Sequence, residues 1–179
     1  ESTILPMLGG GKFAEAYAMT FDGAVIAGRS DSPKGPVACI WFVDGDTGDW
    51  VIKELGALSK KSKDAVATGI AYRRGSAVGE HMVVGYSNTV LYPSEAFVWT
   101  GNPVLEDDEI GYFYDLEYIL TKTGAGEASS MGSSWILWEA TGISAAGDRI
   151  VGWGINPEGG VEAWVVTDYP FDELEFTHD

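Results

Sequence analysis

Three short segments of the chain place a large planar side chain just before small polar residues. They are Arg29-Ser30-Asp31, Tyr86-Ser87-Asn88 and Trp153-Gly154-Ile155-Asn156. Planar side chains can stack on sugar rings while polar neighbours hydrogen-bond to the hydroxyl groups. One interpretation is therefore a carbohydrate site made of Arg29, Asp31, Tyr86, Asn88, Trp153 and Asn156. The sequence favours the simpler alternative, in which these side chains cap the packing of the strands that carry them.

A second candidate site is the acidic segment Asp44-Gly45-Asp46-Thr47-Gly48-Asp49. Calcium binds several carboxylate oxygens within a short turn, and Asp44, Asp46 and Asp49 could supply them. Position 55 is Leu, where a calcium loop between two helices would need Glu. An ordinary Asp/Gly hairpin turn is the favoured interpretation, and no other cofactor is indicated.

Side chains that could do catalysis are few. His81 and His178 are the only histidines, so a Ser-His-Asp arrangement or a His-rich metal site has little support. Cys39 stands in an apolar stretch, where a thiol is usually inert, and as the only cysteine it cannot form an intrachain disulfide. Paired carboxylates for glycoside cleavage stay open because Asp and Glu are abundant along the chain.

The chain is strongly acidic, with 27 Asp and Glu against 11 Lys and Arg and a formal net charge of −16. Such a surface repels phosphate groups, so we expect no nucleic-acid partner. No apolar run approaches the roughly 20 residues of a membrane span, so we expect no membrane insertion. The sequence opens Glu1-Ser2-Thr3 without a basic and apolar leader, so either a leader was removed or none existed.

The candidate side chains belong to a pattern that occurs three times. Each copy has a strand of small residues, a turn at Gly, a β-branched strand that ends in Gly, and a strand of bulkier apolar residues. The copies run from Ala16 to Trp41, from Ala67 to Trp99 and from Ala140 to Val166. Three matching segments of this length indicate a repeat architecture.

Residue size within each copy favours a β-propeller. Small residues on the first strand and bulky residues on the third suit a wedge that widens away from an axis. We therefore predict an all-β single repeat domain over residues 1–179, with propeller-like, four-stranded blades at about 15–64, 65–112 and 138–176. A further strand is predicted at residues 3–8, because Leu5 and Leu8 match the Leu-x-x-Leu of Leu55 and Leu58.

One segment has helical periodicity. Leu116, Ile119 and Leu120 are spaced for one helix face, Asp115 is a suitable N-cap, and Gly124 is a suitable stop. We predict one short helix within an insert at about residues 113–124.

The last copy, Trp135 to Gly159 with Glu162-Ala163-Trp164, resembles the C-terminal repeat of the extracellular HAF-type repeat family. The resemblance extends more loosely over most of residues 5 to 167, although Arg73-Arg74 stands where the family has Asp or another small polar residue. It implies a propeller-like fold and a secreted or cell-surface location, while a cytoplasmic location stays open. The family has no general catalytic motif that the resemblance could transfer.

Three blades are too few for a closed propeller, which typically has four to eight. We therefore expect a homodimer that forms a ring of about six blades, in which the N-terminal strand could complete a blade of the other copy. A fragment of a longer protein and a non-propeller β fold are the competing interpretations.

The leading functional hypothesis is a non-enzymatic, extracellular binding or scaffold module that presents loops on one face of the ring. The alternative is a carbohydrate-active hydrolase or lyase that uses carboxylates near the propeller axis. A purely structural segment of a larger surface protein is a third hypothesis.

Overall fold

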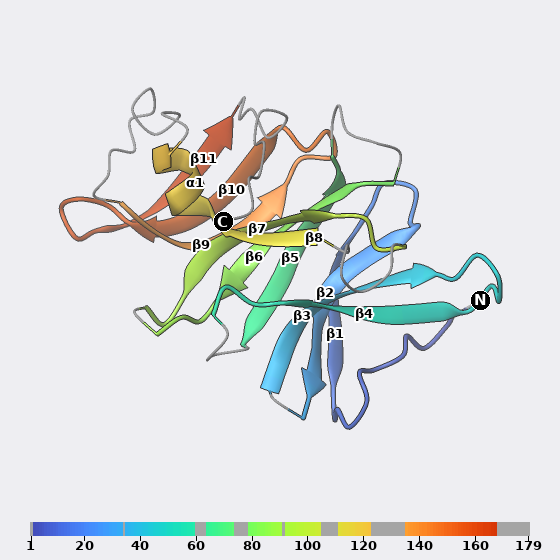
Figure 1. Ribbon diagram of the computed structural model, residues 1–179. Coiled ribbons are helices and arrows are strands. Elements are labelled where there is room, and N and C mark those ends of the chain that lie inside the picture. The colour runs from blue at the N-terminus through green and yellow to red at the C-terminus, as the bar shows by residue number, and fades with distance from the viewer. Residues whose placement is uncertain are drawn as a thin grey trace.

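The structure is a computed structural model that describes residues 2–33, 35–59, 64–73, 79–90, 92–104, 111–122 and 135–167. Within this part the protein is all-β, with three antiparallel sheets and one short helix (Figure 1). The predicted fold class is confirmed. Each sheet is a meander in which strands pair in chain order.

The three sheets follow one another along the chain. The first sheet contains β1 (Ala14–Met19), β2 (Val25–Ser32), β3 (Gly35–Val43) and β4 (Trp50–Gly56). The second sheet contains β5 (Ala65–Tyr72), β6 (His81–Ser87), β7 (Glu95–Gly101) and β8 (Gly111–Asp115). The third sheet contains β9 (Ile136–Ile143), β10 (Arg149–Ile155) and β11 (Val161–Thr167).

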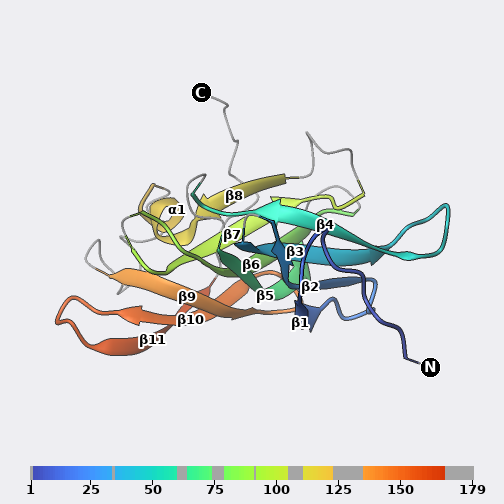
Figure 2. The ribbon, with the colours of Figure 1, turned by 90° about the horizontal axis from the view of Figure 1, so that it is seen from below.

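The sheets pack face to face in chain order, as the blades of a propeller do (Figure 2). We call the face of each sheet that points to the following sheet its front face, and the opposite face its rear face. The first strand of each following sheet lies across the front face before it: β5 packs on β1, β2 and β3, and β9 packs on β5, β6 and β7. One apolar core fills each of the two contacts between sheets.

A glycine near the middle of each second strand is required by close packing. Gly28, Gly85 and Gly152 pair with Cys39, Phe97 and Trp164 of the third strand at equivalent register positions. Opposite each glycine, the first strand has a β-bulge, and a methyl group on the glycine would overlap a first-strand carbonyl oxygen. The bulge and the glycine therefore belong together, which explains why the sequence pattern repeats.

Two buried serines hold the segments that lead into the first and second sheets. Ser30 Oγ accepts a hydrogen bond from Leu8 N at 3.1 Å, and Ser87 Oγ accepts one from Leu58 N at 3.3 Å. Both serines are fully buried. The third sheet has Gly154 at the equivalent position, which offers no side-chain oxygen for such a bond.

Residues 3–8 do not form the predicted strand. The segment is irregular, and the indole Nε1 of Trp41 donates a hydrogen bond to Pro6 O at 2.7 Å. Proline has no N–H to offer a strand ladder, so the segment is held by side-chain contacts on the rear face of the first sheet. Leu8 and Leu58 thus occupy equivalent linker positions, whereas Leu55 lies in β4 and Leu5 lies in no strand.

Strand β8 ends at Asp115, so the second sheet extends beyond the predicted limit of residue 112. The predicted fourth strand of the third unit lies beyond residue 167, outside the described residues.

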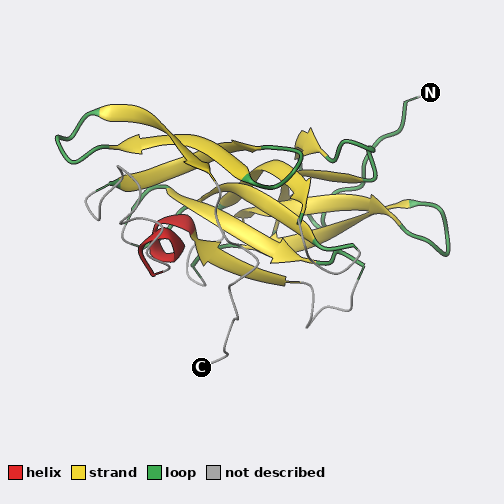
Figure 3. Cartoon of the chain, turned by 90° about the horizontal axis from the view of Figure 1, so that it is seen from above, coloured by secondary structure: helices red, strands yellow, loops and turns green. Residues whose placement is uncertain are grey.

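The predicted short helix is present as α1 (Leu116–Lys122) and follows β8 directly (Figure 3). Asp115 Oδ1 accepts a hydrogen bond from Tyr118 N at 3.1 Å, as an N-cap does. Leu116, Ile119 and Leu120 are buried in the core between the second and third sheets. The helix thus covers part of that core, and Gly124 lies outside the described residues.

The buried carboxyl group of Asp115 should make the stability of the folded protein depend on pH. Burial raises the pKa of its carboxyl more than the hydrogen bonds from Tyr118 and Glu117 lower it. The folded chain then binds this proton more tightly than the unfolded chain, so stability falls as the pH rises from about 3.9 through the higher folded pKa. Asparagine caps a helix equally well without the charge. We expect Asp115→Asn to raise Tm near neutral pH but not at about pH 3, whereas Asp115→Ala should lower Tm at both. Equal Tm changes for the asparagine variant at both pH values would contradict this explanation.

Candidate ligand-binding surface

The three planar side chains found in the sequence occupy equivalent places in the three sheets. Arg29 on β2 pairs with Glu15, Tyr86 on β6 pairs with Val66, and Trp153 on β10 pairs with Glu139. Each follows the close-packed glycine of its second strand. The alignment of the three sequence copies therefore agrees with the strand pairing in the structure.

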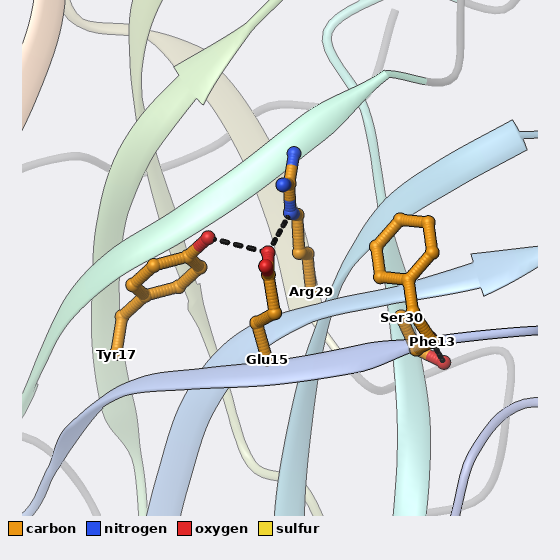
Figure 4. A network of polar contacts seen from close by, with 5 residues as sticks. All are labelled: Phe13, Glu15, Tyr17, Arg29 and Ser30. Atoms are coloured by element: carbon orange, nitrogen blue, oxygen red, sulfur yellow. Dashed lines mark hydrogen bonds and ion pairs between the residues drawn. The ribbon is translucent and has the colours of Figure 1, made fainter.

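Glu15 is the centre of a polar network on the first sheet (Figure 4). Its Oε2 atom accepts hydrogen bonds from Tyr17 Oη at 2.6 Å and from the guanidinium Nε of Arg29. The Arg29 guanidinium also lies over the Phe13 ring, 5.3 Å from its centroid. The bond from Tyr17, and next that from Arg29, lowers the pKa of Glu15, so this carboxylate stays charged at neutral pH.

Tyr86 connects this network to the third sheet. Burial is the main cause that raises the pKa of its hydroxyl, and the nearby Glu139 carboxylate raises it further, while Arg29 lowers it. The phenol of Tyr86 thus lies within electrostatic range of Arg29, Glu15 and Glu139. The structure brings groups from all three sheets to one end of the molecule.

Trp153 completes the set on the front face of the third sheet. Its indole Nε1 donates a hydrogen bond to Glu139 Oε2 at 3.1 Å. Its ring meets that of Trp138 edge to face, with the centroids 5.1 Å apart. Both tryptophans are half-buried, so part of each ring stays accessible to a ligand.

The predicted polar neighbours have structural partners. Asp31 Oδ2 accepts from Lys12 N at 3.2 Å, and Asn88 Nδ2 donates to Asp64 Oδ2 at 3.2 Å. Asn156 Oδ1 accepts from Gly160 N at 2.7 Å and shapes the turn between β10 and β11. These side chains hold loops in place, as the capping alternative expects.

Two carboxylates of the surface were not singled out in the sequence. Glu15 and Glu139 stand directly before the first Ala of their copies, at Ala16 and Ala140. The repeat itself was the available signal, because an acidic residue recurs at one position of two copies. We define the three-sheet surface as Arg29, Tyr86 and Trp153 with Glu15, Tyr17 and Glu139.

The acidic loop between β3 and β4 is organised by its own hydrogen bonds. Asp44 Oδ1 accepts from Thr47 N at 2.8 Å and from Asp46 N at 3.0 Å, and these bonds lower the pKa of Asp44. In the described part of the chain, no group of three His, Cys, Asp or Glu side chains is placed to hold a metal ion. The hydrogen bonds of the segment from Asp44 to Asp49 are those of a hairpin turn.

The reactive residue types lie away from this surface. His81 is buried, its Nδ1 lies 2.7 Å from Gly79 O, and burial lowers its pKa. Cys39 is fully buried, and burial raises the pKa of its thiol far above neutral pH, as an inert core thiol requires. His178 lies outside the described residues.

A hollow of about 140 Å³ lies at the opposite end of the first strands. Equivalent residues from the three sheets line it, namely Met19, Ile70 and Ile143, together with Phe21, Tyr72 and Ala145. Tyr72 Oη donates to Asp22 Oδ2 at 2.6 Å, which lowers the pKa of Asp22 to about 2. Apolar and aromatic side chains line this hollow beside the Asp22 carboxylate, whereas the three-sheet surface carries Arg29, Glu15 and Glu139.

Fold and surface together define the class as an all-β protein of propeller-like repeats. No family model matches the chain, and comparisons with curated proteins and with solved structures find no match either. In the part of the chain that the structure describes, no helix has the length and apolar character needed to cross a membrane.

Proposed function

We propose that this protein is a non-enzymatic binding module that recognises carbohydrate at the three-sheet surface. The observation that carries the proposal is the convergence of one planar side chain from each sheet at one end, beside two carboxylates. Partly exposed aromatic rings supply stacking area, while Arg29, Glu15 and Glu139 supply the charged hydrogen-bonding groups that sugar hydroxyls prefer. The resemblance to the HAF-type repeat family adds export to the proposal.

The state of Glu15 supports binding over hydrolysis. Glycoside cleavage needs one carboxyl group whose pKa is raised, so that it can donate a proton to the leaving group. The pKa of Glu15 is lowered, and its Oε2 already accepts two hydrogen bonds. Such a carboxylate is suited to accept hydrogen bonds from hydroxyl groups rather than to protonate an ether oxygen.

A glycan array followed by a broad glycosidase screen tests this function. We expect binding of at least one glycan class without turnover. Tyr86→Ala should weaken that binding at least tenfold, which corresponds to about 1.4 kcal/mol, because the central ring of the surface is removed. Tyr86→Phe keeps the ring and should lose only the hydroxyl contribution.

Phe21→Ala is the matched control, because Phe21 is an exposed aromatic residue at the opposite end of the first strands. It should bind the same glycan as the wild type does. Turnover of any glycan would contradict a non-enzymatic binding module and favour the hydrolase alternative. Equal loss of binding in the Phe21 and Tyr86 variants would place the ligand elsewhere.

A further inference from the structure

The front face of the third sheet exposes positions that are buried in the other two sheets. Strand pairing defines two equivalent apolar positions on the front face of each sheet. They are Ala27 and Ile40 in the first sheet, Val84 and Val98 in the second, and Val151 and Val165 in the third. In the first and second sheets all four side chains are fully buried by the sheet that follows. In the third sheet Val151 is 45% exposed and Val165 is 53% exposed.

The rear face of the first sheet shows the complementary difference. On β5 the small residue Ala67 and the larger Ile70 are buried against the sheet before them. Their equivalents on β1 are Ala16, which is exposed, and Met19, which is 63% exposed. One end of the chain therefore presents an uncovered front face, and the other end presents a rear face on which β1 is uncovered.

We propose that two copies of this chain associate head to tail, with the front face of each third sheet packed on the rear face of the other copy's first sheet. A two-fold axis relates the two contacts, and each reproduces the contact already made twice within the chain. The assembly has six sheets. Six is the multiple of three that falls within the four to eight blades of closed propellers.

A hydrogen bond between sheets identifies a polar contact of this interface. Thr68 Oγ1, in the bulge of β5, donates to Ala140 O of the third sheet at 2.6 Å and lies 3.2 Å from Val84 O of its own sheet. Thr141 occupies the equivalent bulge of β9, is exposed, and lies 3.4 Å from Val151 O. In the dimer its hydroxyl donates to Ala16 O of the other copy.

The charge of the chain predicts how salt affects the dimer. Each copy carries a formal charge of −16, so the two copies repel each other at long range, while the contact itself is apolar. Added salt screens the repulsion and leaves apolar burial in place. We expect the dimer to tighten as ionic strength rises, the reverse of an interface held by ion pairs.

Sedimentation equilibrium of the full chain at two salt concentrations tests the proposal. The wild type should have twice the monomer mass of 19.2 kDa. Val151→Lys on the front face and Met19→Glu on the rear face should each raise the dimer Kd about 100-fold, because each buries an unpaired charge. Mixing the two variants should restore dimers, because the mixed dimer has one unchanged contact and one contact with opposite charges.

Val104→Lys is the control. Val104 is exposed and follows β7, away from both faces of the proposed contact, so this variant should leave the dimer unchanged. Circular dichroism verifies that each variant is folded. A monomeric wild type would overturn the proposal. So would a dimer that persists in both charged variants, or a mixture of the two variants that stays monomeric.

Discussion

Replacing Gly85 with alanine is expected to lower the free energy of unfolding by about 3 kcal/mol, at the upper end of the range for overpacked cores. A methyl group at this position would overlap Val66 O on the neighbouring strand and come within 2.9 Å of the Phe97 ring. Both groups are fixed, one in a strand ladder and the other in the core between the first and second sheets. Neither can move away without disturbing the second sheet. Chemical denaturation followed by tryptophan fluorescence measures the effect.

Gly142→Ala is the matched control for this substitution. Gly142 is also a strand glycine beside a bulge, but a methyl group there meets only a Val151 methyl group at 3.5 Å, an ordinary contact distance. We expect a change in the free energy of unfolding of less than about 1 kcal/mol. Equal losses in the two variants would show that backbone entropy, rather than the close approach of strands, sets the requirement for glycine.

Trp99→Ala is expected to cost about 4 kcal/mol in the free energy of unfolding. Trp99 is almost fully buried on the rear face of the second sheet, in the core that this sheet shares with the first. The cavity left behind is bordered by paired strands, so it cannot collapse. Loss of this side chain therefore weakens the packing of the second sheet on the first. Calorimetry should show a lower Tm with a single transition.

Trp138→Ala removes the same side chain from a half-buried place and serves as the control. Its ring meets Trp153 edge to face, a contact worth about 1 kcal/mol beyond its buried area. We expect a loss of no more than about 2 kcal/mol. A larger loss for Trp138 than for Trp99 would place the main core on the front face of the third sheet instead.

The repeats and the helix were predictable because local interactions determine them. Each sheet is a meander, so its strands pair with neighbours in the chain, and the recurring Gly28, Gly85 and Gly152 mark the same register position in each copy. Helix α1 likewise depends on a cap and an apolar face within a few residues. Such features are readable from spacing alone.

The conformation of residues 3–8 and the composition of the three-sheet surface could not be predicted from the sequence. The N-terminal segment matches a linker by its leucines, yet its conformation depends on where Trp41 and Ser30 donate and accept hydrogen bonds. The electrostatic proximity of Tyr86 to Arg29, Glu15 and Glu139 depends on how the sheets stack. Asp31, Asn88 and Asn156 look like ligand-binding groups in the sequence, but neighbouring backbone and side chains already use them.

The sequence by itself determined the number of repeats, the strands within each repeat and the planar residue at the end of each second strand. Only the tertiary structure decided which of these side chains meet and which faces of the sheets stay uncovered. The physical reason is that strand pairing within a meander is set by neighbouring residues, whereas contacts between sheets are set by the packing of residues far apart in the chain.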